Sequence, residues 1–303
     1  MPVRRWSWRR ASWVVALVVV AAGAGLVVVD GRSAPPPEPV PNRAFGSAPA
    51  PERPATVWAV GDGADGGRDA KAVARRIAAG RPDRLLYLGD VYPDGDRSAY
   101  ARHYAPVYGS LARRTAPTPG NHEWPQHPEG YDRYWRTVTG APTPPWYALR
   151  LGGWQLLSLN SEAPHGPGSE QLRWLRRRLR APGTCRVAFW HRPRFSAGRH
   201  GDQEDIAPLW NALRGHAALV LSGHDHDLQR LRPIDGLVEL IAGAGGHGHY
   251  ELDEGDPRLA FANDDTYGAL RLDLRPGHAT ARFVAADGRT LDTSAVSCRP
   301  AGR

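Results

Sequence analysis

Polar side chains that could bind metal ions or transfer protons recur where apolar runs of the sequence stop. They are Asp62 in Gly61-Asp62-Gly63, Asp90 after Gly89, Asn121-His122-Glu123 after Gly120, His191 in Trp-His-Arg-Pro, and His224 and His226 in Gly-His-Asp-His. Together they form an oxygen and nitrogen ligand set, which suits Mn, Fe or Zn. No thiolate belongs to the set, and this argues against a structural zinc site. The chemistry indicated is therefore that of a metal centre.

These residues need a scaffold that brings them to one place, and the apolar pattern predicts one. We expect strands at 56–60, 85–88, 186–190, 218–221 and 237–242, a hairpin at 147–151 and 154–159, and helices at 67–80 and around 172–179. Open α/β sheets collect functional residues at the carboxyl ends of their strands, so the polar residues can converge there. Towards the end of the chain, alternating residues around the turn at Pro276-Gly277 predict antiparallel strands.

Taken in order, the five motifs resemble the calcineurin-like metallophosphoesterase superfamily, which includes the purple acid phosphatases. The resemblance covers about 56–290 and is nearest to exported bacterial members. It extends to Phe195-Ser196-Ala197-Gly198, to the Thr-Tyr-Gly-x-Leu segment at 266–270 and to Asp287-Gly288. The resemblance implies an α/β fold, a four-layer α/β/β/α sandwich with antiparallel C-terminal strands. It also implies a phosphoric ester hydrolase, either acid phosphatase-like or a phosphodiesterase.

The resemblance also implies which residues hold metal. Asp90 would bridge two divalent or mixed-valence transition metal ions (Fe, Mn or Zn). One ion would be completed by Asn121, His191 and His224, and the other would be held by Asp62 and His226. Two ions about 3.5–4 Å apart can activate a water and neutralise the phosphoryl oxygens during in-line attack on a phosphate ester.

The residues around these ligands have roles implied in the same way. His122 would protonate the leaving group, with Glu123 or Asp225 as its orienting partner, and His200 would contact the substrate phosphate. We expect His247 and His249, in the glycine-rich segment after 237–242, to lie around the ligands or at the surface and not to bind metal.

One position departs from the family pattern. Many members carry Asp-x-His at the first motif, where this chain has Asp62-Gly63-Ala64. Purple acid phosphatases also lack that histidine and use a tyrosine three residues after the bridging aspartate, whereas Tyr92 comes two residues after Asp90. Alternate residues of an extended segment face the same side, and Pro93 favours an extended Tyr92. Tyr92 could therefore bind the ion held by Asp62, or it could only line the pocket.

The N-terminal segment differs in composition from the rest of the chain. Four arginines precede an uncharged apolar run at 11–29, which is long enough to cross a bilayer. We favour an uncleaved signal anchor at 1–29 over a cleaved signal peptide, then a Pro/Ala-rich linker at 30–55 and a catalytic domain at 56–303. This order predicts an extracytoplasmic domain, either anchored to the membrane or secreted.

Charge and cysteine usage bear on the alternatives. Seven arginines and three acids in the first 55 residues supply half of the net charge of +8, so no nucleic-acid partner is expected. Cys185 and Cys298 fit one disulfide in an exported protein, and two free buried thiols are the alternative. A non-catalytic cell-surface binding protein on the same fold is the rival function. The full set of ligand residues argues against it.

Overall fold

The computed structural model describes residues 52–181 and 185–298, which belong to one compact unit of the chain. Two mixed sheets form its centre. The first has the strand order β13-β12-β11-β1-β2-β3 and the second β10-β8-β9-β7-β6-β5-β4. Strands β1, β2 and β3 run parallel, as do β5, β6, β7 and β9, and the remaining pairings are antiparallel.

The first sheet comprises β1 (Ala55–Val60), β2 (Arg84–Tyr87), β3 (Thr115–Pro117), β11 (Gly268–Arg275), β12 (His278–Ala285) and β13 (Thr290–Ser297). The second comprises β4 (Tyr147–Leu151), β5 (Trp154–Ser158), β6 (Cys185–Phe189), β7 (Leu219–Ser222), β8 (Leu228–Leu231), β9 (Val238–Ala242) and β10 (Leu259–Asn263). The strands expected from the sequence agree with these to within one residue at each end.

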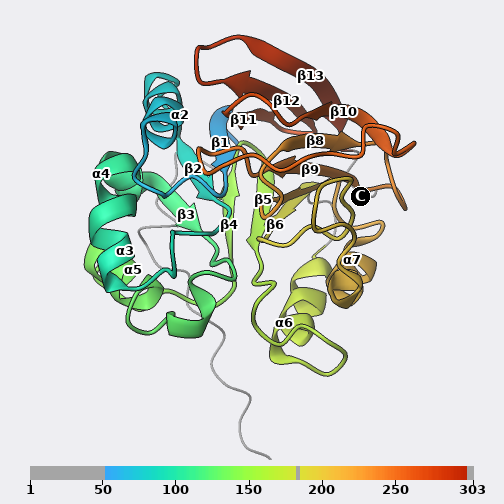
Figure 1. The fold of residues 1–303 in the computed structure, drawn as a ribbon. Coiled ribbons are helices and arrows are strands. Elements are labelled where there is room, and N and C mark those ends of the chain that lie inside the picture. The colour runs from blue at the N-terminus through green and yellow to red at the C-terminus, as the bar shows by residue number, and fades with distance from the viewer. Residues whose placement is uncertain (1–51, 182–184, 299–303) are drawn as a thin grey trace, which may run out of the picture. The chain divides into compact units, whose positions relative to one another are not determined.

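Helices cover the outer face of each sheet (Figure 1). On the first lie α2 (Arg68–Ala79), α3 (Arg97–Ala99), η1 (Tyr100–Tyr104), α4 (Ala105–Tyr108), η2 (Gly109–Arg114) and α5 (Tyr131–Thr139). On the second lie α6 (Glu170–Leu179) and α7 (Ala207–Leu213), and the short turns η3 (Trp124–Gln126) and η4 (Glu204–Ile206) lie in loops. The apolar residues between the sheets come from both of them, so the layers are α/β/β/α, as expected.

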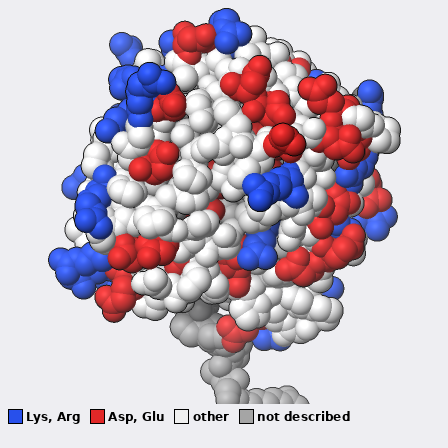
Figure 2. Space-filling view, viewed as in Figure 1, with Lys and Arg blue, Asp and Glu red and all other residues white. Residues whose placement is uncertain are grey.

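Helix α6 forms where the sequence supplies a buried stripe and a capping residue. In α6, Leu172, Leu175 and Leu179 are buried as predicted, and the Ser169 hydroxyl accepts a hydrogen bond from the Leu172 N–H at 3.2 Å. Most arginines of this helix are exposed, which confirms their assignment to its solvated face. Over the face seen in Figure 2, basic and acidic side chains are intermingled.

Cys185 and Cys298 form the expected disulfide, with their Cα atoms 5.7 Å apart. Cys185 begins β6 in the second sheet, and Cys298 follows β13 at the edge of the first. The bond therefore links the end of the described chain to the other sheet. In the described ranges, no helix combines the length and the apolar composition needed to cross a membrane. The signal anchor expected at 1–29 and residues 30–51 of the linker expected at 30–55 lie outside those ranges, and β1 begins at Ala55.

Candidate metal centre

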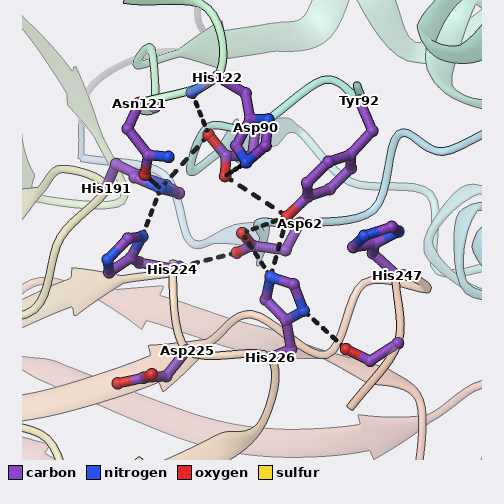
Figure 3. A network of polar contacts seen from close by, with 12 residues as sticks. Asp62, Asp90, Tyr92, Asn121, His122, His191, His224, Asp225, His226 and His247 are labelled. Atoms are coloured by element: carbon purple, nitrogen blue, oxygen red, sulfur yellow. Dashed lines mark hydrogen bonds and ion pairs between the residues drawn. The ribbon is translucent and has the colours of Figure 1, made fainter. Parts of the chain in front are cut away.

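The polar residues singled out in the sequence meet where strands of both sheets end (Figure 3). Asp62 follows β1, and Asp90 and Tyr92 follow β2 in the first sheet, while His191 follows β6, and His224 and His226 follow β7 in the second. Asn121 and His122 come from the segment after β3. The side chains form two groups of ligand atoms that share Asp90.

The first group gathers around Asp90 Oδ1. His191 Nε2 lies 3.4 Å from this oxygen and 3.0 Å from Asn121 Oδ1, and His224 Nδ1 lies 3.1 Å from His191 Nε2. The ligand atoms of Asp90, His191 and His224 all lie within 4.8 Å of one another, and these three residues are buried. The group has one carboxylate, one carboxamide and two imidazoles.

The second group gathers around the phenol of Tyr92. Its Oη lies 3.1 Å from Asp62 Oδ1, 3.4 Å from Asp90 Oδ2 and 2.9 Å from His226 Nε2. The Tyr92 hydroxyl therefore lies among the atoms of this group, although Asp90 is left-handed and the segment is not extended as the alternation argument assumed. Ala64, at the position of the Asp-x-His histidine in the resemblance, is fully buried and contributes no ligand atom.

The chemistry of these atoms fits a cation. His191 Nδ1 donates to the Leu88 carbonyl at 2.8 Å, and His226 Nδ1 donates to the Gly248 carbonyl at 2.6 Å, assignments made from these partners. The other ring nitrogen of each histidine is thereby directed at the carboxylates, as in metal sites whose histidines are oriented by a backbone carbonyl. Without a proton or a cation between them, the carboxylate oxygens and these unprotonated ring nitrogens would repel one another.

Burial and neighbouring charges shift the pKa values of the titratable residues in the site. Burial raises the pKa of Asp62, whereas for Asp90 the nearby His191 outweighs burial and lowers the carboxyl pKa. Burial alone would lower the pKa of His191, but Asp90 raises it to about 10. Burial lowers the pKa of His226 to about 4 and, with the charge of His191, that of His224 to about 2. His224 and His226 are therefore neutral at pH 7, the form in which imidazole binds metal.

The backbone is unusual at three of these residues. Asp62, Asp90 and His224 have φ of 57°, 66° and 72°, in the left-handed region that residues other than glycine seldom adopt. The neighbouring Gly120 cannot be replaced either, because a Cβ there would lie 2.1 Å from Asp90 Oδ1. The left-handed backbone at these residues and the glycine beside Asp90 allow the three side chains to point into the site.

His122 lies beside Asp90 at the edge of the site. Its N–H donates to Asp90 Oδ1 at 3.1 Å, and its Nε2 lies 3.7 Å from Asp90 Oδ2. The other ring nitrogen, Nδ1, contacts the Pro93 carbonyl. The ring is 35% exposed, so it can meet a molecule that enters from solvent.

The expected orienting partners of His122 were wrong. Glu123 is buried beneath the loop, where its Oε2 accepts from the Asp90 and Gly120 N–H groups at 3.0 Å each. Asp225 lies between His224 and His226, and its carboxylate points away from the ligand atoms (Figure 3). Pro93 orients His122 instead.

Asp225 is the partner of His200. Its Oδ1 accepts from the His200 N–H at 2.9 Å and from Nδ1 of the ring at 2.8 Å, while Oδ2 accepts from the Ser196 hydroxyl at 2.5 Å. The His200 ring stacks on His224 with 4.0 Å between the centroids and is 34% exposed. His200 therefore lies at the rim of the first group.

Sequence reasoning missed Tyr250, whose ring stacks on His226 at 3.9 Å and lines the site. His247, expected around the ligands or at the surface, stacks its ring on Tyr92 at 3.8 Å. Both follow β9 in a loop that also holds His249, whose ring stacks on Tyr267 at 4.0 Å. None of these three belongs to either ligand group, as the sequence predicted for the two histidines. Only the position of the loop after a predicted strand could have signalled Tyr250.

Comparison with known proteins agrees with the family resemblance seen in the sequence. The family model described as calcineurin-like phosphoesterase matches residues 55–228. Tartrate-resistant acid phosphatase type 5 of Mus musculus is 29% identical over 147 residues, which are 45% of this chain and 44% of that protein. The chain thus spans less than half of the mouse protein in this match. The Rattus norvegicus protein of the same name is 23% identical over 276 residues, 77% of this chain and 84% of that protein.

Two solved structures share the fold. The purple acid phosphatase PPD1 from yellow lupin (Lupinus luteus) seeds has a TM-score of 0.68 and 17% identity, over 84% of this chain and 56% of that one. GAP50, described as the anchor in the inner membrane complex of Plasmodium, also has a TM-score of 0.68, with 16% identity over 82% of this chain and 90% of that one. At these identities the likeness concerns the fold alone.

Proposed function

The chain belongs to the calcineurin-like phosphoesterase family, and we propose that it hydrolyses phosphate esters at a dinuclear metal centre. The family membership classes it as a phosphoric ester hydrolase that uses divalent metal ions. The proposal goes further, to two ions that share a bridging aspartate.

The observation that carries the proposal is the placement of Asp90. Its Oδ1 lies 3.4 Å from His191 Nε2 in the first group, and its Oδ2 lies 3.4 Å from Tyr92 Oη in the second. One carboxylate therefore faces two separate sets of ligand atoms. Asp90, Asn121, His191 and His224 would hold one ion, and Asp62, Asp90, Tyr92 and His226 the other. Fe, Mn and Zn all suit these ligands.

When bound, two such ions supply an activated water and neutralise charge on the phosphoryl oxygens. The protein residues around them bind and orient the ester. His200, held by Asp225, contacts the phosphate from the rim. His122, held by the Pro93 carbonyl, gives its proton to the departing alkoxide. Its exposed ring leaves space for the leaving group on the solvent side.

A non-catalytic protein on this fold is the second candidate, because GAP50, an anchor protein, has the same fold. That likeness concerns fold only, and the complete set of ligand and proton-donating residues favours hydrolysis. For the rest of the chain we propose the arrangement expected from the sequence. Residues 56–303 form the catalytic domain, carried outside the cell by an anchor at 1–29 and a linker at 30–55. The Cys185–Cys298 disulfide supports an oxidising location.

The decisive experiment combines hydrolysis with elemental analysis of bound metal. Wild type loaded with Mn, Fe or Zn should hydrolyse p-nitrophenyl phosphate and bind two ions per chain. Asp90→Asn and His224→Ala should each abolish hydrolysis and lower the metal content. The matched control is His216→Ala, because His216 is an exposed histidine outside the site. Full activity of the Asp90 variant, or a single ion in the active wild type, would contradict a shared aspartate.

A further inference from the structure

Three arginines line a small pocket on the outer face of the first sheet. They are Arg76 of α2, Arg271 of β11 and Arg282 of β12, and the pocket has a volume of about 250 Å³. It lies where the last turn of α2 meets the sheet, on the face that Figure 1 shows covered by this helix. The described residues that line the pocket include no acid and no member of the metal centre.

The register of the sheet places two of these arginines and a tryptophan in one row. Trp58 of β1 is opposite Arg271, and Arg271 is opposite Arg282. Side chains directly opposite each other in antiparallel strands lie on the same face, and like charges in such a pair destabilise the sheet. The pairing of Arg271 with Arg282 therefore carries a cost that a bound anion would offset.

One carboxylate is shared between these two arginines. Asp273 Oδ1 accepts from Arg271 Nη2 at 2.9 Å, and Oδ2 accepts from Arg282 Nη1 at 2.5 Å. Oδ1 also accepts from the Thr56 hydroxyl at 3.1 Å. A single acid offsets one of the two guanidinium charges, so one positive charge of this row is left over at the pocket.

Arg76 adds a further positive charge from the helix. Its Nη2 donates to the Asp287 carbonyl at 3.4 Å, in the turn between β12 and β13. The Asp287 carboxylate is paired with Arg289 at 2.7 Å. Gly288 in the same turn approaches closely, since a Cβ there would lie 2.7 Å from Arg76 Nη2. The turn thus holds the Arg76 guanidinium through a neutral carbonyl group, and the pocket keeps an excess of positive charge.

Two buried N–H groups of the lining residues have no hydrogen-bond partner among the described residues. They are Arg76 Nε and the indole nitrogen of Trp58. A donor that loses its bonds to water on folding and finds no acceptor destabilises the folded protein. Excess positive charge and unpaired donors thus occur in the same pocket, and both favour an oxyanion as its ligand.

We propose that this pocket is a second phosphate-binding site, separate from the metal centre. A phosphate group has several acceptor oxygens, and guanidinium groups bind it in a bidentate manner. Arg271 and Arg282 also line a neighbouring cavity of about 660 Å³, which would receive the organic part of a phosphate monoester. The inference does not depend on the proposed function, because it uses none of the residues of the metal centre.

The indole N–H of Trp58 gives a local readout of binding. In zinc-loaded protein with isotope-labelled tryptophan, Trp58→Phe identifies its NMR signal, and inorganic phosphate should shift that signal. Arg76→Gln should weaken the phosphate affinity measured from the shift roughly tenfold, the order expected for one charged hydrogen bond, and Arg76→Lys should retain part of the affinity. Arg75→Gln is the matched control, because Arg75 is exposed on the same helix and does not line the pocket. It should leave the affinity unchanged.

Inhibition of hydrolysis by phosphate reports on the metal centre and separates the two sites. The inhibition constant of phosphate with p-nitrophenyl phosphate as substrate should be the same in wild type and Arg76→Gln. A parallel loss of inhibition and of the Trp58 shift would place both effects at one site and overturn the proposal. If wild type hydrolyses no phosphate ester, the proposed function fails, and the NMR titration still decides this inference.

Phenylphosphonate, whose carbon–phosphorus bond is not hydrolysed, distinguishes two sources of the phosphate group. If it binds more tightly than inorganic phosphate in the same titration, the ligand is an ester whose organic part occupies the larger cavity. If it binds more weakly, the ligand is the free anion. Shifts of the Trp58 signal that do not depend on Arg76 with either compound, or no shift with either, would overturn the proposal.

Discussion

Glu239 on β9 should make the stability of the protein depend on pH. Its side chain is fully buried, with Oε1 accepting from the Arg194 N–H and Oε2 from the Phe195 N–H, both at 2.9 Å. The Ser222 hydroxyl donates to Oε1 at 3.3 Å. Glu239 thereby holds the start of the loop that leads from His191 to His200. Burial raises its pKa to about 8, although these donors and the charge of Arg194 lower it.

The raised pKa of Glu239 determines how the stability of the protein changes with pH. The folded protein holds this proton more tightly than the unfolded chain, whose glutamates titrate near 4.5. The stability that the protonated side chain contributes is fully present below about pH 4.5 and is lost as the pH rises through about 8. At about 1.4 kcal/mol per pH unit, the loss over this window is on the order of 5 kcal/mol.

Glu239→Gln isolates this contribution, because its carboxamide has the same shape and cannot ionise. Its NH₂ group would face a backbone N–H, and one unsatisfied buried donor costs about 1–3 kcal/mol at every pH. The variant should therefore be less stable than wild type at pH 5, and the difference should shrink and reverse towards pH 8.5.

Urea unfolding of both proteins across pH 5–8.5 measures the difference directly. Glu129→Gln, an exposed glutamate before α5, serves as the matched control and should follow wild type throughout. If the free energies of unfolding of wild type and Glu239→Gln stay parallel over this range, Glu239 is already ionised in the folded protein and the reasoning fails.

Three further predictions concern the metal centre. His122→Ala should slow hydrolysis of esters with poor leaving groups roughly 10²–10⁴-fold while metal content stays unchanged, with a smaller loss for a nitrophenyl ester; equal losses would argue against proton donation. Iron-loaded wild type should be coloured by phenolate-to-iron charge transfer, and Tyr92→Phe should bleach it while the circular dichroism spectrum is kept; a colourless wild type would remove Tyr92 from the ligands. Asp225→Asn should lower kcat/KM roughly tenfold through His200, an effect that vanishes when His200 is already alanine. Additive losses in that double variant would show that Asp225 acts elsewhere.

The positions of the proposed ligand residues could be predicted because they follow from strand ends. Apolar runs that stop at a glycine and a polar residue place Asp62 and Asp90 at one edge of the first sheet, and the runs before His191 and His224 do the same in the second. For Tyr92 the sequence left two possibilities open, a ligand or a residue that lines the pocket, and its role as a ligand stays a prediction. Where an apolar run ends and which polar residue follows it can be read from a short stretch of sequence.

The partners of these residues could not be predicted, since they depend on how loops pack. Glu123 follows His122 in the sequence, but its carboxylate turns under the backbone to Asp90 and Gly120. The loop after β9 returns over His226 and brings Tyr250 beneath Arg199, about fifty residues apart in the chain. No periodicity signals a contact of this kind. The anchor at 1–29 and the linker at 30–55 stay predictions, because all of their residues except 52–55 lie outside the described ranges.

The left-handed backbone at Asp62, Asp90 and His224 has a consequence for how this protein can evolve. A residue with a Cβ in that region carries a conformational cost of about 1–2 kcal/mol, which glycine does not carry. Replacing any of the three by glycine would delete a proposed ligand and relax the chain, so the inactive variant could be the more stable protein. At these positions selection for catalysis and selection for stability act in opposite directions, and a screen for thermal stability alone would drive the site towards loss.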